Sequence, residues 1–340
     1  MDGILFRSEI YSSYLEPEST TGRFELFLHN EIARRPRTGP QVIGVGDSRM
    51  PLLPRISNEL RAQTGITFAS IAVPGTSPRC WYYELRDVDP DARRYAAVVI
   101  PLNAYGDEDG WENPAERMVD LHYVVARLRL GDVIEFAASY PKPQSRWEAF
   151  RGGLFKGFIY KRDFQDFLLR PQERIEKVQW MWRDSAGWFY NFPGDPRTLR
   201  GLQVDYPTGR ITFPAGLPQQ MQDLVRGTLL LPVAPQTGKN REYRSQWLGK
   251  IVDRYRDSTT RIVFLRLPRS PVPRPGVAQP ARNTVVGSLA GRRNVVVLEE
   301  HLFDSLERPE LFMDPIHLNK EGCTRFSQML AQEMRKLLGS

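Results

Sequence analysis

Apolar residues gather in five short runs, three near the start of the chain and two near its end. An unbroken apolar run of this length is typical of a strand with both faces buried, as in a parallel sheet. The runs are QVIGVG at 41–46, ITFASIAV at 66–73, YAAVVIPL at 95–102, RIVFLRL at 261–267 and NVVVL at 294–298.

Helical spacing of apolar residues appears between and after these runs. It is found in the segment 51–65, and 320–338 has the pattern of a closing helix. Strands that alternate with helices predict an α/β fold with a doubly wound, parallel, five-stranded sheet. In the first of these helices the spacing rests on Leu52, Leu53, Ile56 and Leu60.

A long central segment, 111–239, interrupts this alternation of strands and helices. We interpret it as an insertion beside the active-site edge of the core. The core then comprises 41–110 and 240–340, and 1–40 forms an N-terminal extension. Residues 201–213, GLQVDYPTGRITF, predict a hairpin. Two roles for the aromatic residues of the insertion stay open, a wall that binds sugar or acyl groups and a small core of its own. These residues include Trp147, Trp180, Trp182, Trp188, Tyr190 and Phe192.

Composition narrows the class of protein. Hydrophobic residues make up 41% of the chain and charged residues 26%, which is typical of a folded globular protein. The net charge of +7 comes from scattered arginines, so we expect no nucleic-acid partner. No stretch reaches the roughly 18 apolar residues of a membrane span, and the first residues lack the order of a signal peptide. We therefore expect a chain that is soluble as given, without a span of its own.

Ser48 is the first candidate for chemistry. It follows the predicted strand 41–46 in the sequence GVGDSRM, which places it at the carboxyl end of that strand and the start of a helix. Open α/β sheets bind ligands at this edge, and the unpaired N–H groups of a helix start can stabilise an oxyanion. The alternative is that Asp47 or Ser48 only caps the helix.

The far end of the chain supplies partners for a serine nucleophile. Asp314 and His317 stand three residues apart in MDPIHLNKEG, just before the last predicted helix. A histidine can take the proton of Ser48, and an aspartate can hold the imidazole in the required tautomer. The alternative for His317 is a structural histidine bonded to a nearby carbonyl.

Gly75 and Asn103 follow the second and third predicted strands and complete the set of candidate site residues. The Gly75 backbone N–H and the Asn103 side-chain amide are candidate donors to an oxyanion, together with the Ser48 N–H. Their alternative roles are a turn glycine and a loop cap. Arg49 could orient an anionic substrate or be an ordinary exposed arginine. His29, His122 and His301 have no second ligand at metal spacing, so we expect no metal or other cofactor.

In order and position, Gly46-Asp47-Ser48, Gly75, Asn103 and Asp314-Pro315-Ile316-His317 resemble the four motifs of the SGNH (GDSL) hydrolase superfamily. The resemblance covers about 41–105 and 260–338. It implies a flavodoxin-like sheet, Ser48 as nucleophile with His317 and Asp314, and an oxyanion hole made by Ser48, Gly75 and Asn103. The third motif reads Pro-Leu-Asn here, where the family usually has Gly-x-Asn-Asp.

The large insertion and this third motif look more like the extracytoplasmic SGNH proteins of alginate acetylation and teichoic acid D-alanylation. Those proteins work beside a membrane-bound O-acyltransferase. The resemblance implies a serine esterase or O-acyltransferase in the periplasm or cell envelope that acts on acyl esters, with acetyl esters of carbohydrate as the expected substrates. The alternative is a catalytically idle module of the same fold that binds polysaccharide or assembles a membrane acylation complex.

Overall fold

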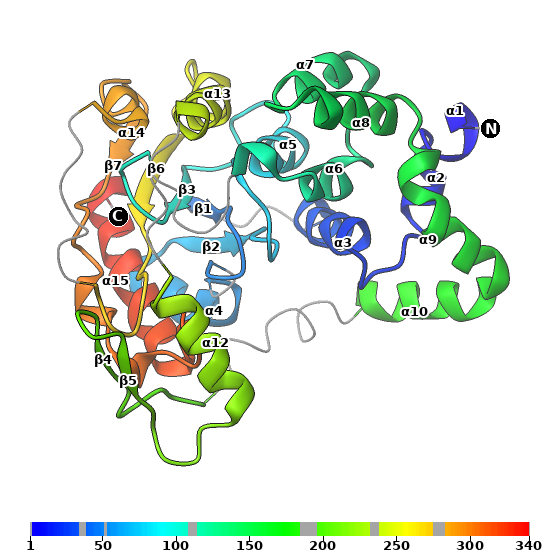
Figure 1. The fold of residues 1–340 in the computed structure, drawn as a ribbon. Helices are drawn as coiled ribbons and strands as arrows, with labels where there is room; N and C mark the ends of the chain where they lie inside the picture. Colours follow the sequence, from blue (N-terminus) through cyan, green and yellow to red (C-terminus); the bar gives the residue numbers. More distant parts are fainter. Residues whose placement is uncertain are drawn as a thin grey trace.

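The computed structural model describes residues 2–33, 39–50, 53–107, 114–183, 196–231, 238–274 and 283–339. Its centre is a five-stranded, all-parallel sheet in the order β2-β1-β3-β6-β7, flanked by helices (Figure 1). This arrangement confirms the predicted α/β class and is consistent with a flavodoxin-like fold. The strands are β1 (Gln41–Gly44), β2 (Thr67–Ser70), β3 (Ala97–Leu102), β6 (Arg261–Arg266) and β7 (Val295–Val297).

Alternate residues of each strand face opposite sides of the sheet, so the unbroken apolar runs fill two cores. One core contains Ile43, Val98, Ile100, Ile262 and Phe264. The other contains Val42, Ala97, Val99, Val263 and Leu265.

Helices from distant parts of the chain cover the two faces. The first core includes side chains from α3 (Thr20–Ala33), α5 (Pro78–Val88), α13 (Gly238–Arg254) and α14 (Val285–Leu289). The second includes side chains from α4 (Leu53–Thr64), α12 (Gln219–Leu229) and α15 (Lys320–Leu338). The two predicted helices, 51–65 and 320–338, are therefore present as α4 and α15, although Pro51 and Leu52 lie outside the described residues.

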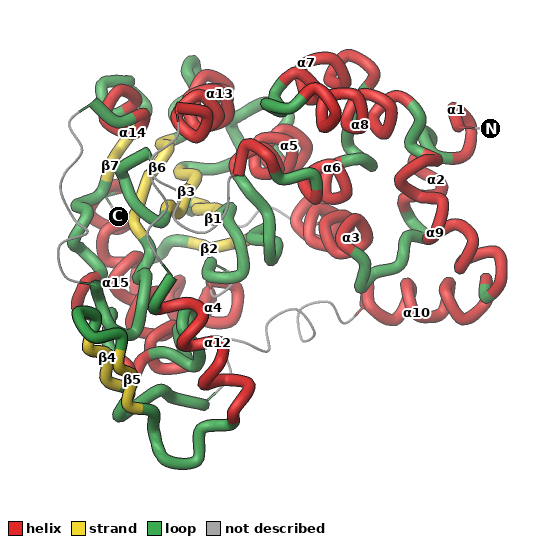
Figure 2. The backbone as a smooth tube through the Cα atoms, in the orientation of Figure 1, coloured by secondary structure: helices red, strands yellow, loops and turns green. Residues whose placement is uncertain are grey.

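Most helices of the central segment stand apart from the sheet with the N-terminal helices, as a helical lobe (Figure 2). Because α3 packs against both α5 and α6, it joins this lobe to the sheet. The lobe consists of α1 (Asp2–Leu5), α2 (Glu9–Ser12), α6 (Val119–Val124), α7 (Val133–Ala138), α8 (Pro143–Leu154), α9 (Gly157–Leu169) and α10 (Pro171–Arg183).

The rest of the central segment runs below the sheet as a hairpin and α12 (Figure 1). The predicted hairpin is confirmed as an antiparallel pair, β4 (Gln203–Asp205) and β5 (Arg210–Thr212). None of the helices in the described ranges is both long enough and apolar enough to cross a bilayer. Single 3-10 turns are η1 (Pro114–Glu116), η2 (Leu130–Asp132), η4 (Asp304–Leu306) and η5 (Pro309–Leu311).

Trp247 of α13 should be a major source of stability, because its side chain is fully buried against Tyr82 and Tyr83 of α5. We expect Trp247→Ala to lower the free energy of unfolding by about 3–5 kcal/mol in a denaturant titration. Trp180, which is 53% exposed, is the matched control, and Trp180→Ala should cost no more than about 0.5 kcal/mol. Equal losses for the two variants would contradict this account of how α13 packs.

Candidate active site

Ser48 lies in a turn between β1 and α4. We expected it at the start of a helix, but α4 begins at Leu53, and 48–49 form a separate turn. The Asp47 carboxylate closes this turn by accepting a hydrogen bond from the Arg49 N–H at 3.0 Å. Asp47 therefore caps the turn and not the helix, and the Ser48 hydroxyl has a different partner.

That partner is His317. The Ser48 Oγ and the His317 Nε2 are 2.8 Å apart, although 269 positions separate the two residues. On the other side of the ring, His317 Nδ1 lies 2.8 Å from Asp314 Oδ2. The three side chains form one hydrogen-bonded chain, the arrangement in which a histidine can remove a serine proton.

The loop that carries Asp314 and His317 is fastened at both ends. Phe312 and Leu318 form an isolated antiparallel bridge, and the Met313 N–H donates to the His317 carbonyl at 3.0 Å. Asn319 then caps α15, because its side chain accepts from the Gly322 N–H. The imidazole is thus held on a short loop between fixed points.

Asp314 is held in its ionised form. Burial by itself would raise the pKa of this carboxyl, but the His317 ring and two backbone N–H donors hold the pKa below its usual value. These donors are the N–H groups of Ile316 and His317, at 2.9 and 2.8 Å from Oδ1. A carboxylate that stays charged at neutral pH can stabilise an imidazolium beside it.

A cavity of about 210 Å³ opens beside Ser48. Gly75 and Asn103 both line it, so the structure brings the three expected oxyanion residues to one place at the carboxyl ends of β1, β2 and β3. This is also the point where the strand order reverses around β1, the usual ligand site of such sheets. The remaining lining residues are Asp47, Arg49, Thr76, Ser77, Pro78, Trp81, Pro101, Leu102, Pro114, Arg117, Arg244 and Ile316.

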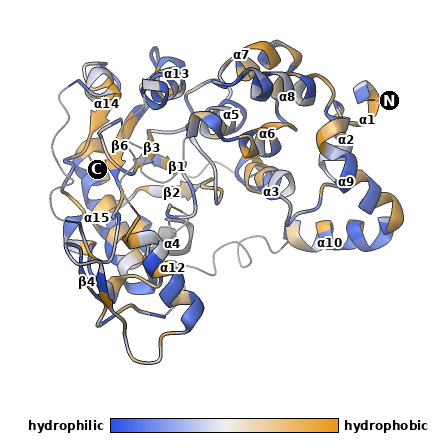
Figure 3. Cartoon of the chain, in the orientation of Figure 1, coloured by the Kyte–Doolittle hydropathy of each residue, from blue (hydrophilic) through white to orange (hydrophobic). Residues whose placement is uncertain are grey.

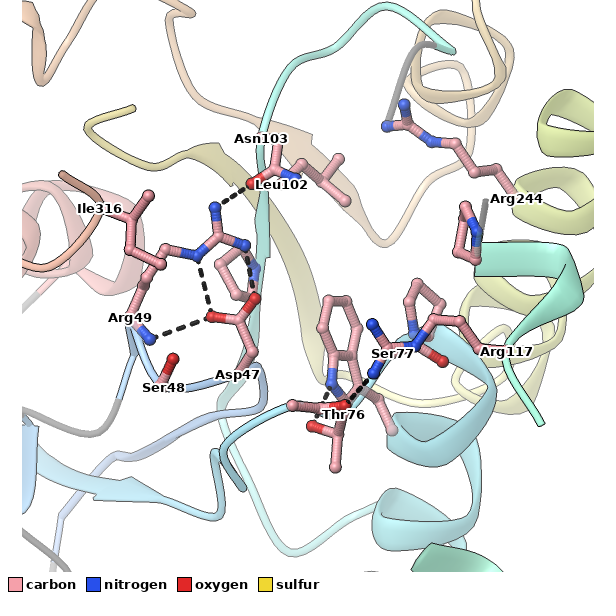
Figure 4. A pocket seen from close by; sticks show the side chains of 15 residues that line it. Asp47, Ser48, Arg49, Thr76, Ser77, Leu102, Asn103, Arg117, Arg244 and Ile316 are labelled. Atoms are coloured by element: carbon pink, nitrogen blue, oxygen red, sulfur yellow. Dashed lines mark hydrogen bonds and ion pairs between the residues drawn. The ribbon is translucent and has the colours of Figure 1, made fainter. Parts of the chain in front are cut away.

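Arg49 bridges two sides of this cavity (Figure 4). Its guanidinium pairs with the Asp47 carboxylate and donates to the Asn103 Oδ1. Arg49 occupies the amide oxygen of Asn103, and the amide nitrogen is the atom of this side chain that can donate a hydrogen bond. Burial would raise the pKa of Asp47, but the charge and hydrogen bonds of Arg49 hold it below its usual value.

Two side chains of the central segment, Tyr123 of α6 and Arg117 just before this helix, hold the turn that contains Gly75. The Tyr123 hydroxyl donates to the Pro74 carbonyl at 2.7 Å, and the Arg117 guanidinium donates to the Gly75 carbonyl. The Pro74 carbonyl and the Gly75 N–H belong to one planar peptide and point in opposite directions. Tyr123 therefore directs the Gly75 N–H away from itself.

Two backbone donors at the cavity have no acceptor among the described residues. In the part of the chain that the structure describes, neither the Ser48 N–H nor the Gly75 N–H donates a hydrogen bond. Both residues are partly exposed at the cavity, so these N–H groups are accessible to water or to a bound group. A negatively charged oxygen bound in the cavity could accept hydrogen bonds from them.

The tryptophans singled out in the central segment lie elsewhere. Trp147 and Trp180 are exposed, Trp182 stacks on His29 with ring centroids 4.3 Å apart, and none of them lines the cavity. Trp188, Tyr190 and Phe192 lie outside the described residues. The aromatic side chain that does line the cavity is Trp81 of α5.

Sequence reasoning missed Tyr123 and Arg117, which stand in no motif. The described residues contain no group of three side chains that could hold a metal ion. His301 instead pairs with Asp304 at 2.8 Å. The chain matches no protein-family model and no curated protein sequence.

Gly75 should not tolerate a side chain. Its φ is +79°, and an added Cβ would lie 2.6 Å from the Tyr123 hydroxyl oxygen. We expect Gly75→Ala to lower the free energy of unfolding by about 2–5 kcal/mol, from backbone strain and overpacking together.

Gly65 separates these two contributions. Its φ is +74°, but no atom lies within 4 Å of an added Cβ, so Gly65→Ala should show only the backbone cost of about 1 kcal/mol. Adding Tyr123→Phe to Gly75→Ala should recover part of the stability, because it removes the clashing oxygen. If the double variant were no more stable than Gly75→Ala, the steric explanation would be wrong.

Proposed function

We propose that this chain is a serine esterase or O-acyltransferase acting on acyl esters, with Ser48, His317 and Asp314 as its catalytic triad. The observation that carries the proposal is the 2.8 Å contact between Ser48 Oγ and His317 Nε2, backed by the Asp314 contact of equal length. A serine hydroxyl alone is a poor nucleophile, and this geometry activates it. The resemblance of the four motifs to SGNH hydrolases supports the same function.

The reaction proceeds in two steps. Ser48 Oγ attacks the ester carbonyl while His317 takes its proton, and the oxyanion accepts hydrogen bonds from the Ser48 and Gly75 N–H groups and the Asn103 amide. The alkoxide leaves with the proton from His317, and the acyl group stays on Ser48. Water or a sugar hydroxyl then gives its proton to His317 and attacks the acyl-enzyme, and His317 returns this proton to the Ser48 Oγ as the acyl group leaves it.

The choice of acceptor separates an esterase from an O-acyltransferase, because both use the same triad. The resemblance favours carbohydrate acetyl esters and a place outside the cytoplasmic membrane beside a membrane-bound O-acyltransferase. The rival, an idle module of the same fold, would leave a gap between Ser48 and His317 or fill it with another side chain. The short contact between them favours the enzyme.

Ester turnover tests the proposal directly. The wild type should hydrolyse a chromogenic acetyl ester and be labelled on Ser48 by a fluorophosphonate, located by mass spectrometry of the labelled peptide. Ser48→Ala and His317→Ala should lose at least about 10³-fold in kcat and lose the labelling, because both remove the activated nucleophile.

Ser145→Ala, in α8 and away from the cavity, is the control and should keep full activity. Wild-type protein that neither turns over the ester nor reacts with the fluorophosphonate would refute the proposal. Glycan binding that survived Ser48→Ala in such inactive protein would then support the idle binding module.

Tyr123 should act as a positioning residue for the oxyanion hole. Tyr123→Phe removes the donor that fixes the peptide between Pro74 and Gly75, so we expect kcat to fall roughly tenfold with little change in KM. The amide ¹⁵N signal of Gly75 should also move, because its peptide carbonyl loses a hydrogen bond.

Tyr206 provides the matched control, since its hydroxyl also donates to a backbone carbonyl, that of Val272 at 2.6 Å, outside the cavity lining. Tyr206→Phe should leave kcat and the Gly75 signal unchanged. A Tyr123→Phe enzyme with the kcat of the wild type would show that the clamp has no part in the reaction.

A further inference from the structure

The outer side of α9 carries large apolar side chains that none of the described residues covers. Phe158, Leu168 and Leu169 are 56, 61 and 81% exposed, and Phe155, just before the helix, is 49% exposed. The rings of Phe155 and Phe158 touch edge to face, with centroids 6.2 Å apart. Figure 3 shows hydrophobic colour at the outer turn where α9 leads into α10.

The opposite side of α9 explains why these side chains face outward. Tyr160, Phe164 and Phe167 form the packed side, where their rings contact Tyr11 of α2. Residues 155, 158, 161, 162, 165, 168 and 169 recur at helical spacing on the other side, and all are exposed. We call this stripe the outer face of α9.

The charges of the outer face are all positive. Lys161 and Arg162 stand midway along it and have no ion-pair partner among the described residues, and Arg151 lies over the Phe158 ring at 4.7 Å. The two carboxylates of α9 lie outside this stripe and are paired, although the Asp166 side chain is 35% exposed and also contacts Arg170. Asp163 accepts from Tyr11 and Asp166 pairs with Arg174.

We propose that the outer face of α9 docks on the surface of a membrane that contains anionic lipid. A helix face with bulky apolar residues at its ends, cations between them and no carboxylate among its own residues suits the boundary between headgroups and acyl chains. There the apolar side chains enter the boundary, and the cations meet lipid phosphates. The inference does not depend on the proposed activity.

A second copy of the chain fits this face less well. In a two-fold pairing the same patch meets itself, so Lys161 and Arg162 of one copy would lie near those of the other. Like charges close together destabilise such an interface. Lipid phosphates provide the opposite charge.

Vesicle binding tests the proposal. The full chain should sediment with vesicles of phosphatidylcholine mixed with phosphatidylglycerol, bind less at high salt, and bind weakly to phosphatidylcholine alone. Leu168→Ser with Leu169→Ser should weaken binding by at least about tenfold, because apolar burial is lost. Lys161→Ala with Arg162→Ala should do the same through lost phosphate contacts.

Leu224 and Leu231 are the matched controls, since they are 50 and 55% exposed at and just beyond α12. Leu224→Ser with Leu231→Ser should bind vesicles as the wild type does. Any of three results overturns the proposal: no wild-type binding, equal binding to both lipid compositions, or unchanged binding by the α9 variants. Concentration-dependent dimers that the leucine variants abolish would assign the face to a second copy instead.

Discussion

The candidate site depends on the packing of α15 against α4. Ser48 lies a few residues before α4, and His317 lies a few residues before α15, so the contact between these helices brings two ends of the chain together. Phe326 and Leu330 of α15 share the second core with Leu60 of α4 and with Val42 and Val99 of the sheet. Apolar burial is strong but has no direction. The distance between Ser48 and His317 is therefore set by the fastened loop between Phe312 and Leu318.

The central segment supports the other half of the site. Helix α6 supplies Tyr123 to the turn before α5, and its Asp120 accepts from Ser77 at the start of α5. Asp120 also pairs with Arg79, and both side chains are fully buried. Burying two charged side chains costs free energy that apolar packing would not cost. The contribution of this pair is therefore geometric, because its hydrogen bonds form in only one arrangement of the elements that carry them. The central segment, which the sequence indicates as an insertion, is therefore a structural part of the cavity wall.

Most of the fold could be predicted because the sheet is buried on both faces, so each strand appears in the sequence as a mainly apolar run. The ends of the strands could not be predicted in this way. The run 66–73 is apolar except for Thr67 and Ser70, yet β2 ends at Ser70, and Ile71 and Val73 are buried in the loop that follows. Hydrophobicity reports burial, and only backbone pairing separates a buried strand from a buried loop. Ser48 was expected at the start of a helix, but it lies in the turn closed by Asp47, before α4.

The sequence by itself determined the α/β class, the strand runs, and the residue types Ser48, Asp314 and His317 at the ends of predicted elements. These are local features, since periodicity and turn chemistry act over a few residues. Tertiary structure alone decided that Ser48 and His317 meet at 2.8 Å, that Arg49 lies between Asp47 and Asn103, and that Tyr123 holds the Gly75 turn. Such contacts join residues far apart in the chain, and their distances follow from how whole helices pack.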